Sequence, residues 1–393
     1  MIRGHKIRLH PTAEQQNYFA RAAGTARFVW NWALAEWNRQ YEAGEKPNAF
    51  KLKKQFNAIR RKEFPWTWDV TKNASDQPFL DLGKAWTTFF DGLKTGRKVG
   101  RPRFKSRKRS KASFCLQNDK FELGDHRIWI PKLGWVNMAE NLRFRGKVLG
   151  ARISRTADWW FASITVEVPD VQPQVKRPAA VGIDVGLNRL ATLSTGEEFE
   201  NQKFLTTALK KLRRANKRLH RRTLGSKNRE KACRQVARLH YRITCLRDDV
   251  LQKLTTRLAN CYGIIGIETL NLKGLLKNKR LARSFSDAAL GKLLRLLTNK
   301  VEQRGGRVVK VGQYFPSSKT CHACGWKWED MTLSDRVFRC QNPACAYHHF
   351  AQDRDHNAAL NILCEALYVI GLIDHVVGGT GSDEDGNLAV DLT

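Results

Sequence analysis

The first 170 residues contain two kinds of hydrophobic pattern, one after the other. Residues 1–10 alternate between apolar and polar side chains, which predicts a strand. Thr12 followed by Gln15 is typical of a capping box at the start of a long helix, and apolar residues continue at helical spacing to about residue 93. We therefore expect most aromatic side chains of this region to form a helical core. Short alternating runs (SFCLQ, RIWIP, LRFRG, WWFASITVEV) in residues 112–170 then predict a small antiparallel sheet or barrel.

In the second half of the chain, buried strands alternate with helices. Residues 180–195 and 261–275 each begin with an apolar strand, and each of these strands contains one carboxylate, Asp184 and Glu268. Residues 203–247 predict the main part of a helical hairpin that is broken at Gly225-Ser226. This order of strands and helices predicts an α/β domain with a mixed sheet.

A further helix and strand precede the cysteine-rich part of the chain. The helix is expected to be capped at Ser286 or Asp287 and to stop at Gly305-Gly306, where the strand RVVKVGQYF follows.

The charge of the chain restricts its partners. In 393 residues, 70 Lys and Arg against 37 Asp and Glu leave a formal charge of +33, which is costly in self-repulsion unless a polyanion offsets it. Ten Lys or Arg and no acid lie in residues 94–111, and sixteen with one acid lie in residues 203–247. Such density neutralises phosphates without distinguishing bases, so we expect a nucleic-acid partner; a basic linker and a solvated helical face are the alternatives. The candidate phosphate contacts are Arg101, Arg103, Lys105, Arg107, Lys108, Arg109, Lys217, Arg218, Arg221 and Arg222.

Four of the nine cysteines have the spacing of a metal site. Cys321 and Cys324 form a Cys-x2-Cys pair, and fifteen residues later Cys340 and Cys345 form a Cys-x4-Cys pair. This pattern predicts a closed, structural zinc ribbon with four thiolate ligands. Three histidines are reserve ligands: His322, His348 and His349.

The chain shows no signal for export or membrane insertion. It has neither an apolar leader after Met1 nor a run of about 20 apolar residues, so we expect a soluble, unsecreted, cytoplasmic protein. Reduced thiols are then favoured over disulfides.

Three carboxylates lie where chemistry could occur. Asp184 and Glu268 lie in buried strands, and Asp355 lies at the start of the last apolar helix. A carboxylate in an apolar strand is costly unless it is paired or bound to metal. Mg²⁺ prefers such hard oxygen ligands, and a pair of ions about 4 Å apart can serve phosphodiester displacement. A structural role for Asp184 is equally open on this pattern alone.

Several motifs resemble those of TnpB proteins, the transposon-associated relatives of type V CRISPR effectors. They are GIDVG, GIETLNLKGL, PSSKTCHACG, the second cysteine pair and DRDHNAALNIL, together with KIRLHPTAEQ and GRPRFKSRKR near the N-terminus. The resemblance spans nearly the whole chain. It implies an RNase H-like (RuvC) nuclease domain with a zinc-ribbon insert, an N-terminal helical recognition lobe and a small β-barrel wedge domain. The implied boundaries are 1–10 and 105–172 for the wedge domain, 11–104 for the recognition domain, 178–317 and 348–374 for the nuclease domain, 318–347 for the zinc ribbon, and 375–393 for a flexible acidic tail.

The resemblance also implies an activity and its residues. Asp184, Glu268 and Asp355 match the catalytic, magnesium-binding carboxylates of that family, with Asp353 as a helix N-terminal acid or an acid that contacts the metal ligands, and Asn357 as a support of the metal site. The implied activity is guide-RNA-directed cleavage of double-stranded DNA beside a short flanking motif, in the prokaryotic cytoplasm and associated with the nucleoid. Four residues between the last two cysteines, where two are commoner, and the added HHFAQ leave the ribbon geometry open.

Three other hypotheses remain. The chain could be a compact type V CRISPR-associated effector of the same fold, or an RNA-guided DNA-binding repressor that does not cleave. It could also be a guide-independent transposase or a zinc-ribbon DNA-binding protein. The guide RNA, the flanking motif, the oligomeric state and the role of the acidic tail are not defined by the sequence.

Overall fold

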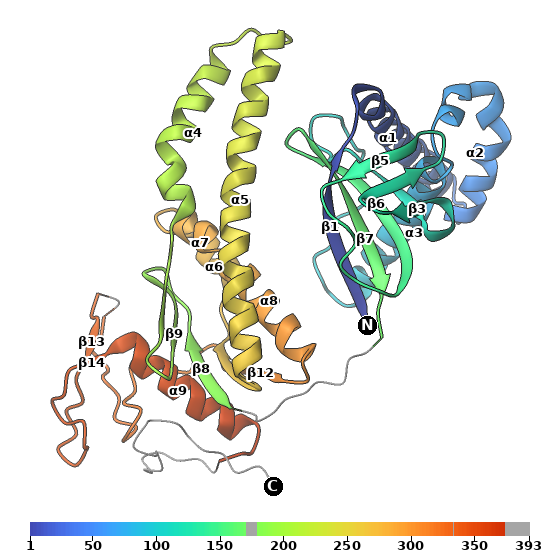
Figure 1. Cartoon of the computed structure of the whole chain (residues 1–393). Coiled ribbons are helices and arrows are strands. Elements are labelled where there is room, and N and C mark those ends of the chain that lie inside the picture. Colours follow the sequence, from blue (N-terminus) through green and yellow to red (C-terminus); the bar gives the residue numbers. More distant parts are fainter. Residues whose placement is uncertain (170–178, 333, 374–393) are drawn as a thin grey trace. The chain divides into compact units, whose positions relative to one another are not determined.

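The chain divides into two units, Met1–Asp170 and Val171–Thr393 (Figure 1). The computed structural model describes residues 1–169, 179–332 and 334–373, so the predicted acidic tail lies outside the described residues. Within these ranges, no helix is both long enough and apolar enough to cross a membrane.

The helices of the first unit begin at polar caps. Thr12 accepts a hydrogen bond from the backbone of Gln15, whose side chain accepts one from the backbone of Thr12, and this confirms the predicted capping box. The elements are α1 (Ala13–Glu42), α2 (Ala49–Glu63), the 3-10 helix η1 (Pro65–Asp69) and α3 (Asn73–Lys94). Most of their aromatic side chains pack together, as predicted, and Trp37 and Trp86 stack with ring centroids 5.4 Å apart.

The strands of the first unit form one antiparallel sheet with the order β2-β6-β7-β1-β5-β4-β3. They are β1 (Ile2–His10), β2 (Ser113–Gln117), β3 (Glu122–Gly124), β4 (Arg127–Ile130), β5 (Gly134–Met138), β6 (Lys147–Thr156) and β7 (Trp159–Glu167), with the 3-10 helix η2 (Asn118–Lys120) between β2 and β3. In the described residues β2 and β3 stay unpaired with each other, so the predicted barrel does not close and is not confirmed. The run LRFRG is not a strand either.

The second unit is built on a mixed five-stranded sheet with the order β10-β9-β8-β11-β12. Its strands are β8 (Ala180–Asp184), β9 (Arg189–Leu193), β10 (Glu198–Glu200), β11 (Ile264–Glu268) and β12 (Arg307–Val311). β11 is parallel to both β8 and β12, whereas β9 pairs antiparallel with β8 and β10. The predicted mixed α/β fold is therefore confirmed.

Helices cover both faces of this sheet. The helices are α4 (Phe204–His220), α5 (Lys227–Cys261), α6 (Leu272–Lys277), α7 (Ala282–Ala288), α8 (Leu290–Glu302) and α9 (Arg354–Val369). Side chains of α5 and α8 form one core with the strands, and those of α9 form a second core with β11 and β12. The α4–α5 hairpin extends beyond the sheet, as Figure 1 shows. Two short strands, β13 (Val337–Phe338) and β14 (Gln352–Asp353), lead into α9.

The predicted cap at Ser286 or Asp287 is wrong. Asp287 lies inside α7 and is buried, and its carboxylate accepts hydrogen bonds from the backbone of Leu205 and Thr206 in the first turn of α4. It also pairs with Arg247 of α5 at 2.8 Å. Asp287 therefore satisfies the free N–H groups of a helix that is distant in sequence.

Candidate functional site

The strand order brings the predicted carboxylates to one edge of the sheet. Asp184 and Glu268 end the neighbouring parallel strands β8 and β11, in which Ile183 pairs with Ile267. Asp355 lies in the first turn of α9, which packs on the same strands. Burial first, and then the negative charges of Glu268 and Asp355, raise the pKa of Asp184 to about 7. The three carboxylates are thus close enough to act on one another.

Two glycines let α9 approach this edge. A Cβ at Gly182 of β8 would lie 2.1 Å from the carbonyl oxygen of Ala359, and one at Gly266 of β11 would lie 2.7 Å from the Cβ of Ala366. Both contacts are far shorter than van der Waals distance. The absence of side chains at these two positions therefore determines how near Asp355 comes to the strand ends.

Neighbouring groups hold the acids at the edge. The hydroxyl of Ser317 donates to Glu268, and Arg354 donates to Asp355 at 2.8 Å. Asp353 caps α9 by accepting from the backbone of Asp355 and His356, which confirms the prediction of a helix N-terminal acid.

Asp353 also forms an ion pair that joins α9 to β9. Arg189 donates to Asp353 at 2.7 Å and to Glu198 at 2.8 Å. Burial acts to raise the pKa of Asp353, but the hydrogen bonds from Arg189 and the helix N-terminus outweigh burial and lower it. Asp353 is therefore a charged anchor of α9.

The four predicted cysteines form one cluster. All four Sγ atoms lie within 4.8 Å of one another, with 3.8 Å between Cys321 and Cys345 and 3.5 Å between Cys324 and Cys340. A tetrahedron with Zn–S bonds of about 2.3 Å has edges of about 3.8 Å, so the thiols fit a structural zinc ion. Within the described part of the chain, the three carboxylates do not reach this closeness.

The environment of the cluster suits a metal. Burial acts to raise the pKa of Cys324, but hydrogen bonds from the backbone of Trp326 and the side chain of Asn342 lower it to about 7. Burial raises the pKa of Cys340. The thiols therefore differ in how readily they ionise, and a cation would be needed to hold all four as thiolates.

The remaining predicted residues of this region have other partners. The side chain of Asn357 donates to the carbonyl of Thr320 and accepts from the backbone of His322, and its predicted support of the metal site stays a prediction. The ring of His322 also bonds to Asn357, and His348 and His349 pack ring against ring. These histidines lie outside the four-thiol cluster.

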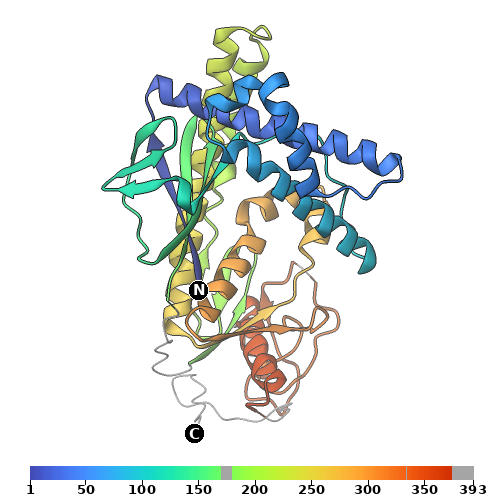
Figure 2. The ribbon, with the colours of Figure 1, turned by 90° about the vertical axis from the view of Figure 1, so that its right-hand side faces the viewer.

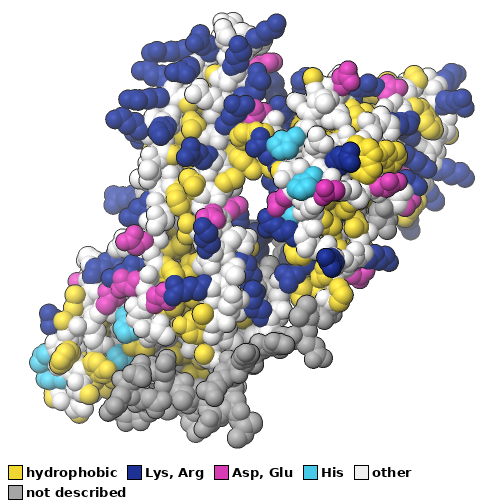
Figure 3. All heavy atoms as spheres, viewed as in Figure 1, with side chains coloured by type: hydrophobic (Ala, Val, Ile, Leu, Met, Phe, Trp, Pro, Cys, Tyr) yellow, Lys and Arg dark blue, Asp and Glu magenta, His cyan; other side chains and the backbone are white. Residues whose placement is uncertain are grey.

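Most of the candidate phosphate contacts are exposed. Residues 97–112 form no helix or strand, and the Lys and Arg side chains named in that segment are exposed except for Lys105. The ammonium of Lys105 lies 3.5 Å from the centroid of the Trp30 ring, and burial lowers its pKa. Lys217, Arg218, Arg221 and Arg222 are exposed at the end of α4 and in the turn that follows. Figure 3 shows Lys and Arg side chains along the α4–α5 hairpin.

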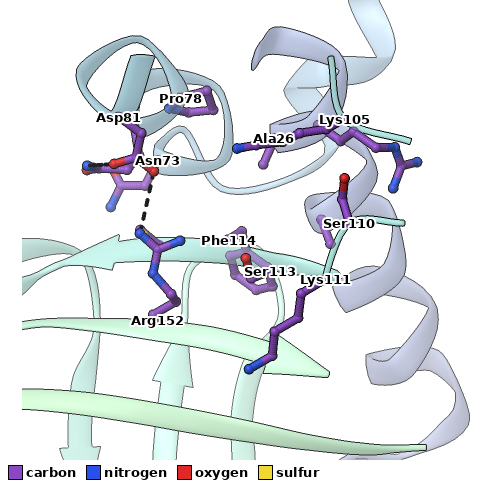
Figure 4. A pocket seen from close by; sticks show the side chains of 14 residues that line it. Ala26, Asn73, Pro78, Asp81, Lys105, Ser110, Lys111, Ser113, Phe114 and Arg152 are labelled. Carbon is purple, nitrogen blue, oxygen red and sulfur yellow. Dashed lines mark hydrogen bonds and ion pairs between the residues drawn. The ribbon is translucent and has the colours of Figure 1, made fainter. Parts of the chain in front are cut away.

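A hollow of about 240 Å³ lies in the first unit, between α1, α3 and the sheet (Figure 4). Arg152 and Asp81 face each other there at 3.4 Å, and Lys105 and Lys111 also line it. Asn73 is 2% exposed, and its side-chain nitrogen has no hydrogen-bond partner among the described residues. No sequence signal pointed to the hollow, because its lining comes from four separate segments.

Sequence reasoning missed Ser317, Arg354 and Arg189 as partners of the carboxylates. Ser317 and Arg354 lie inside the motifs PSSKTCHACG and DRDHNAALNIL, but nothing in their spacing indicates what they contact.

Comparison with known proteins gives the chain a family. A helix-turn-helix domain model of IS605 OrfB matches residues 1–46, a probable transposase model of IS605 OrfB matches residues 163–279, and a Cas12f1-like TNB domain model matches residues 291–362. In the structure, residues 1–46 contain the strand β1 and the single long helix α1. The ribbon and its four cysteines lie within the TNB match.

Relatives match nearly the whole chain. A protein of Streptomyces pristinaespiralis named "Putative RNA-guided DNA endonuclease" is 34% identical over 371 residues, covering 93% of this chain and 89% of that protein. InsQ of Escherichia coli K12, which has the same description, is 31% identical over 398 residues, with 96% of each covered. A Cas12f1 chain in a complex with sgRNA and target DNA superposes with a TM-score of 0.56 at 16% identity, covering 89% of this chain and 83% of that chain.

These matches and the geometry define the class of protein, a mixed α/β protein of Cas12f-like fold with a four-cysteine, zinc-binding TNB domain. The chain belongs to the IS605 OrfB/TnpB family.

Proposed function

We propose that the chain is an RNA-guided DNA endonuclease, which uses a bound guide RNA to cut double-stranded DNA beside a short flanking motif. The observation that carries this proposal is the convergence of Asp184, Glu268 and Asp355: burial, and then the charges of the other two carboxylates, raise the pKa of Asp184. The names of the full-length relatives support it. Base pairing with the guide would select the target, and the protein would bind backbones and the flanking motif.

The three carboxylates are the proposed catalytic residues. Their oxygens are the ligand type that Mg²⁺ prefers, and one or two such ions would supply an activated water and charge stabilisation at the leaving oxygen. Glu268 is oriented by Ser317, and Asp355 by Arg354 and the start of α9. The four cysteines have no part in this chemistry, because four thiolates close the coordination sphere of zinc.

Each proposed domain has its own part in this activity. The nuclease domain (178–317 and 348–374) carries the carboxylates, and the ribbon (318–347) binds target nucleic acid beside them. The helical region (11–104) and the wedge domain (1–10 and 105–172) hold guide RNA and duplex DNA. The basic residues of 101–109 and of the α4–α5 hairpin would bind phosphates, since most of them are exposed and acids are absent from 101–109 and few in the hairpin.

The test is cleavage of a plasmid library that carries a guide-matched target beside randomised flanks. The full chain is purified with its RNA, that RNA is sequenced, and cutting is measured with and without Mg²⁺. Wild type should cut only matched targets, whereas Asp184→Asn should bind them and not cut. Asp249→Asn is the matched control, because this exposed acid pairs with Lys253 on α5 and lies outside the site.

Two results would overturn the proposal. Wild type that binds the matched target in Mg²⁺ without cutting would be a guided repressor. Purification without any specific RNA would indicate a guide-independent DNA-binding protein.

A further inference from the structure

Ser317 connects the zinc ribbon to the carboxylate edge. It lies four residues before Cys321, it is 4% exposed, and its hydroxyl donates to Oε1 of Glu268. A buried hydroxyl needs a partner, and backbone carbonyls are the usual ones. Here the partner is the carboxylate of Glu268. Ser317 therefore restrains the rotamer of Glu268 in addition to packing in the interior.

Two asparagines of α9 clamp the segment that carries Ser317. Asn361 donates to the carbonyls of Ser317 and Thr320, both at 2.7 Å, and Asn357 donates to the carbonyl of Thr320 at 2.7 Å. Asn357 also accepts from the backbone of His322 at 3.1 Å. The two asparagines are 1% and 7% exposed and lie four residues apart, on one face of the helix.

This clamp joins the metal cluster to the acids by short links. Thr320 directly precedes Cys321, one of the four zinc-ligand thiols, and Asn357 is two residues from Asp355 on α9. Figure 2 shows α9 with the loops of residues 313–350 beside it. A ribbon that keeps its fold therefore fixes Asp355 through the asparagines and Glu268 through Ser317. Without the ribbon, the buried side-chain amides of α9 would lose their hydrogen-bond partners.

We infer that Ser317 is a positioning residue for Glu268, and that the Asn357–Asn361 clamp makes the geometry of the catalytic carboxylates depend on a folded, zinc-loaded ribbon. The inference rests on the proposed function. In metal sites generally, loss of a group that orients a ligand lowers metal affinity about 10- to 100-fold. A serine that only filled space would not act on divalent-ion affinity.

The experiment measures Mn²⁺ binding by electron paramagnetic resonance, using the full chain with its copurified RNA. Zinc content is determined for every sample, and only zinc-loaded protein is compared. Ser317→Ala should weaken Mn²⁺ binding about tenfold, and Ser317→Thr, which keeps the hydroxyl, should stay within about threefold of wild type. Ser318→Ala, a change in the adjacent serine, should leave the affinity unchanged.

A second variant tests the clamp. Asn361→Ala removes the donor to both carbonyls without touching a carboxylate, and it should also weaken Mn²⁺ binding several-fold in zinc-loaded protein. Removal of zinc by a thiol-reactive reagent should lower the Mn²⁺ affinity of wild type by at least as much as Ser317→Ala does.

The outcomes separate the two claims. Wild type should bind Mn²⁺ at a site that is lost in Asp184→Asn. If no such site is found, the proposed function fails. If wild type does bind such an ion, but zinc-loaded Ser317→Ala binds it as tightly as wild type, the positioning role of Ser317 is refuted. Likewise, unchanged Mn²⁺ affinity in both Asn361→Ala and zinc-free protein would refute the dependence on the ribbon.

Discussion

Gly182→Ala tests whether the close packing of α9 sets the site. The new Cβ would lie 2.1 Å from the carbonyl oxygen of Ala359 and 2.6 Å from the backbone nitrogen of Leu363, where ordinary contacts are 3.4–4 Å. The difference between 3.4 and 2.1 Å means that α9 must withdraw by about 1.3 Å. Both opposing atoms are helix backbone, so no side-chain rotation can relieve the contact.

The withdrawal has two measurable effects. Overpacking of this kind costs about 1–3 kcal/mol, so amide exchange in β8 and α9 should become about 5- to 150-fold faster, as measured by mass spectrometry. Because Asp355 is carried on the same helix, a displacement of about 1 Å should lower the single-turnover cleavage rate about 100-fold. Zinc content should be unchanged.

Gly312→Ala is the matched control. This glycine follows β12 in the same unit, and a Cβ added to it would have no atom within 4 Å. The amide exchange rates of the Gly312→Ala variant should change little, since a substitution that creates no close contact changes the free energy of unfolding by at most about 0.5 kcal/mol. If Gly182→Ala exchanged and cut like wild type, the close approach of α9 would not control the carboxylates.

Four further changes address separate features. Tyr18→Phe should cost about 1–3 kcal/mol in chemical denaturation, because the hydroxyl donates to Pro131 at 2.7 Å and accepts from Thr71 at 2.8 Å. Burial raises the pKa of Tyr18 to about 12, above the value of about 10 for an exposed tyrosine. The stabilisation by the neutral hydroxyl is therefore lost as pH rises above about 10, and Tyr18→Phe should not show this loss. Cys324→Ser should release zinc, as measured by elemental analysis, and speed amide exchange within 318–347. Asp184→Asn should raise the melting temperature in EDTA, because it removes a buried charge and its repulsion by Glu268 and Asp355, while it abolishes cutting. Changing four hairpin residues to Gln should reduce the slope of log affinity against log salt by about 3 for a phosphate-binding surface. Those four residues are Lys217, Arg218, Arg221 and Arg222.

Local sequence patterns predicted the helices and strands better than they predicted which distant segments contact one another. The capping box at Thr12 and the acid Asp353 were recognisable because a helix N-terminus needs acceptors within three residues. Closure of a sheet depends on whether its edge strands meet, which is a contact between distant segments, and the barrel expectation failed for that reason. Asp287 shows the same limit, because it caps a helix that begins about 80 residues earlier.

The candidate site was predictable only where its residues lie in recognisable local patterns. Lone carboxylates at the ends of apolar strands are visible in a sequence, and the parallel pairing of β8 with β11 then brings two of them together. The groups that hold them, Ser317 and Arg354, carry no local signature. Lys105 shows a related limit: its ammonium lies over the ring of Trp30, a contact between distant segments that the basic run does not indicate, and its phosphate contact stays a prediction.

The charges of the chain place two opposite demands on the proposed nucleic-acid site. A net charge of +33 attracts a polyanion, whereas three clustered carboxylates repel the phosphate that must reach them. A divalent cation held by Asp184, Glu268 and Asp355 would offset this repulsion locally, while the exposed basic residues would act elsewhere. Binding and cutting should therefore respond to different ions: monovalent salt should weaken binding, and EDTA should abolish cutting while guide RNA and target stay bound. Loss of target binding in EDTA at constant ionic strength and constant zinc content would show that the carboxylates also take part in affinity.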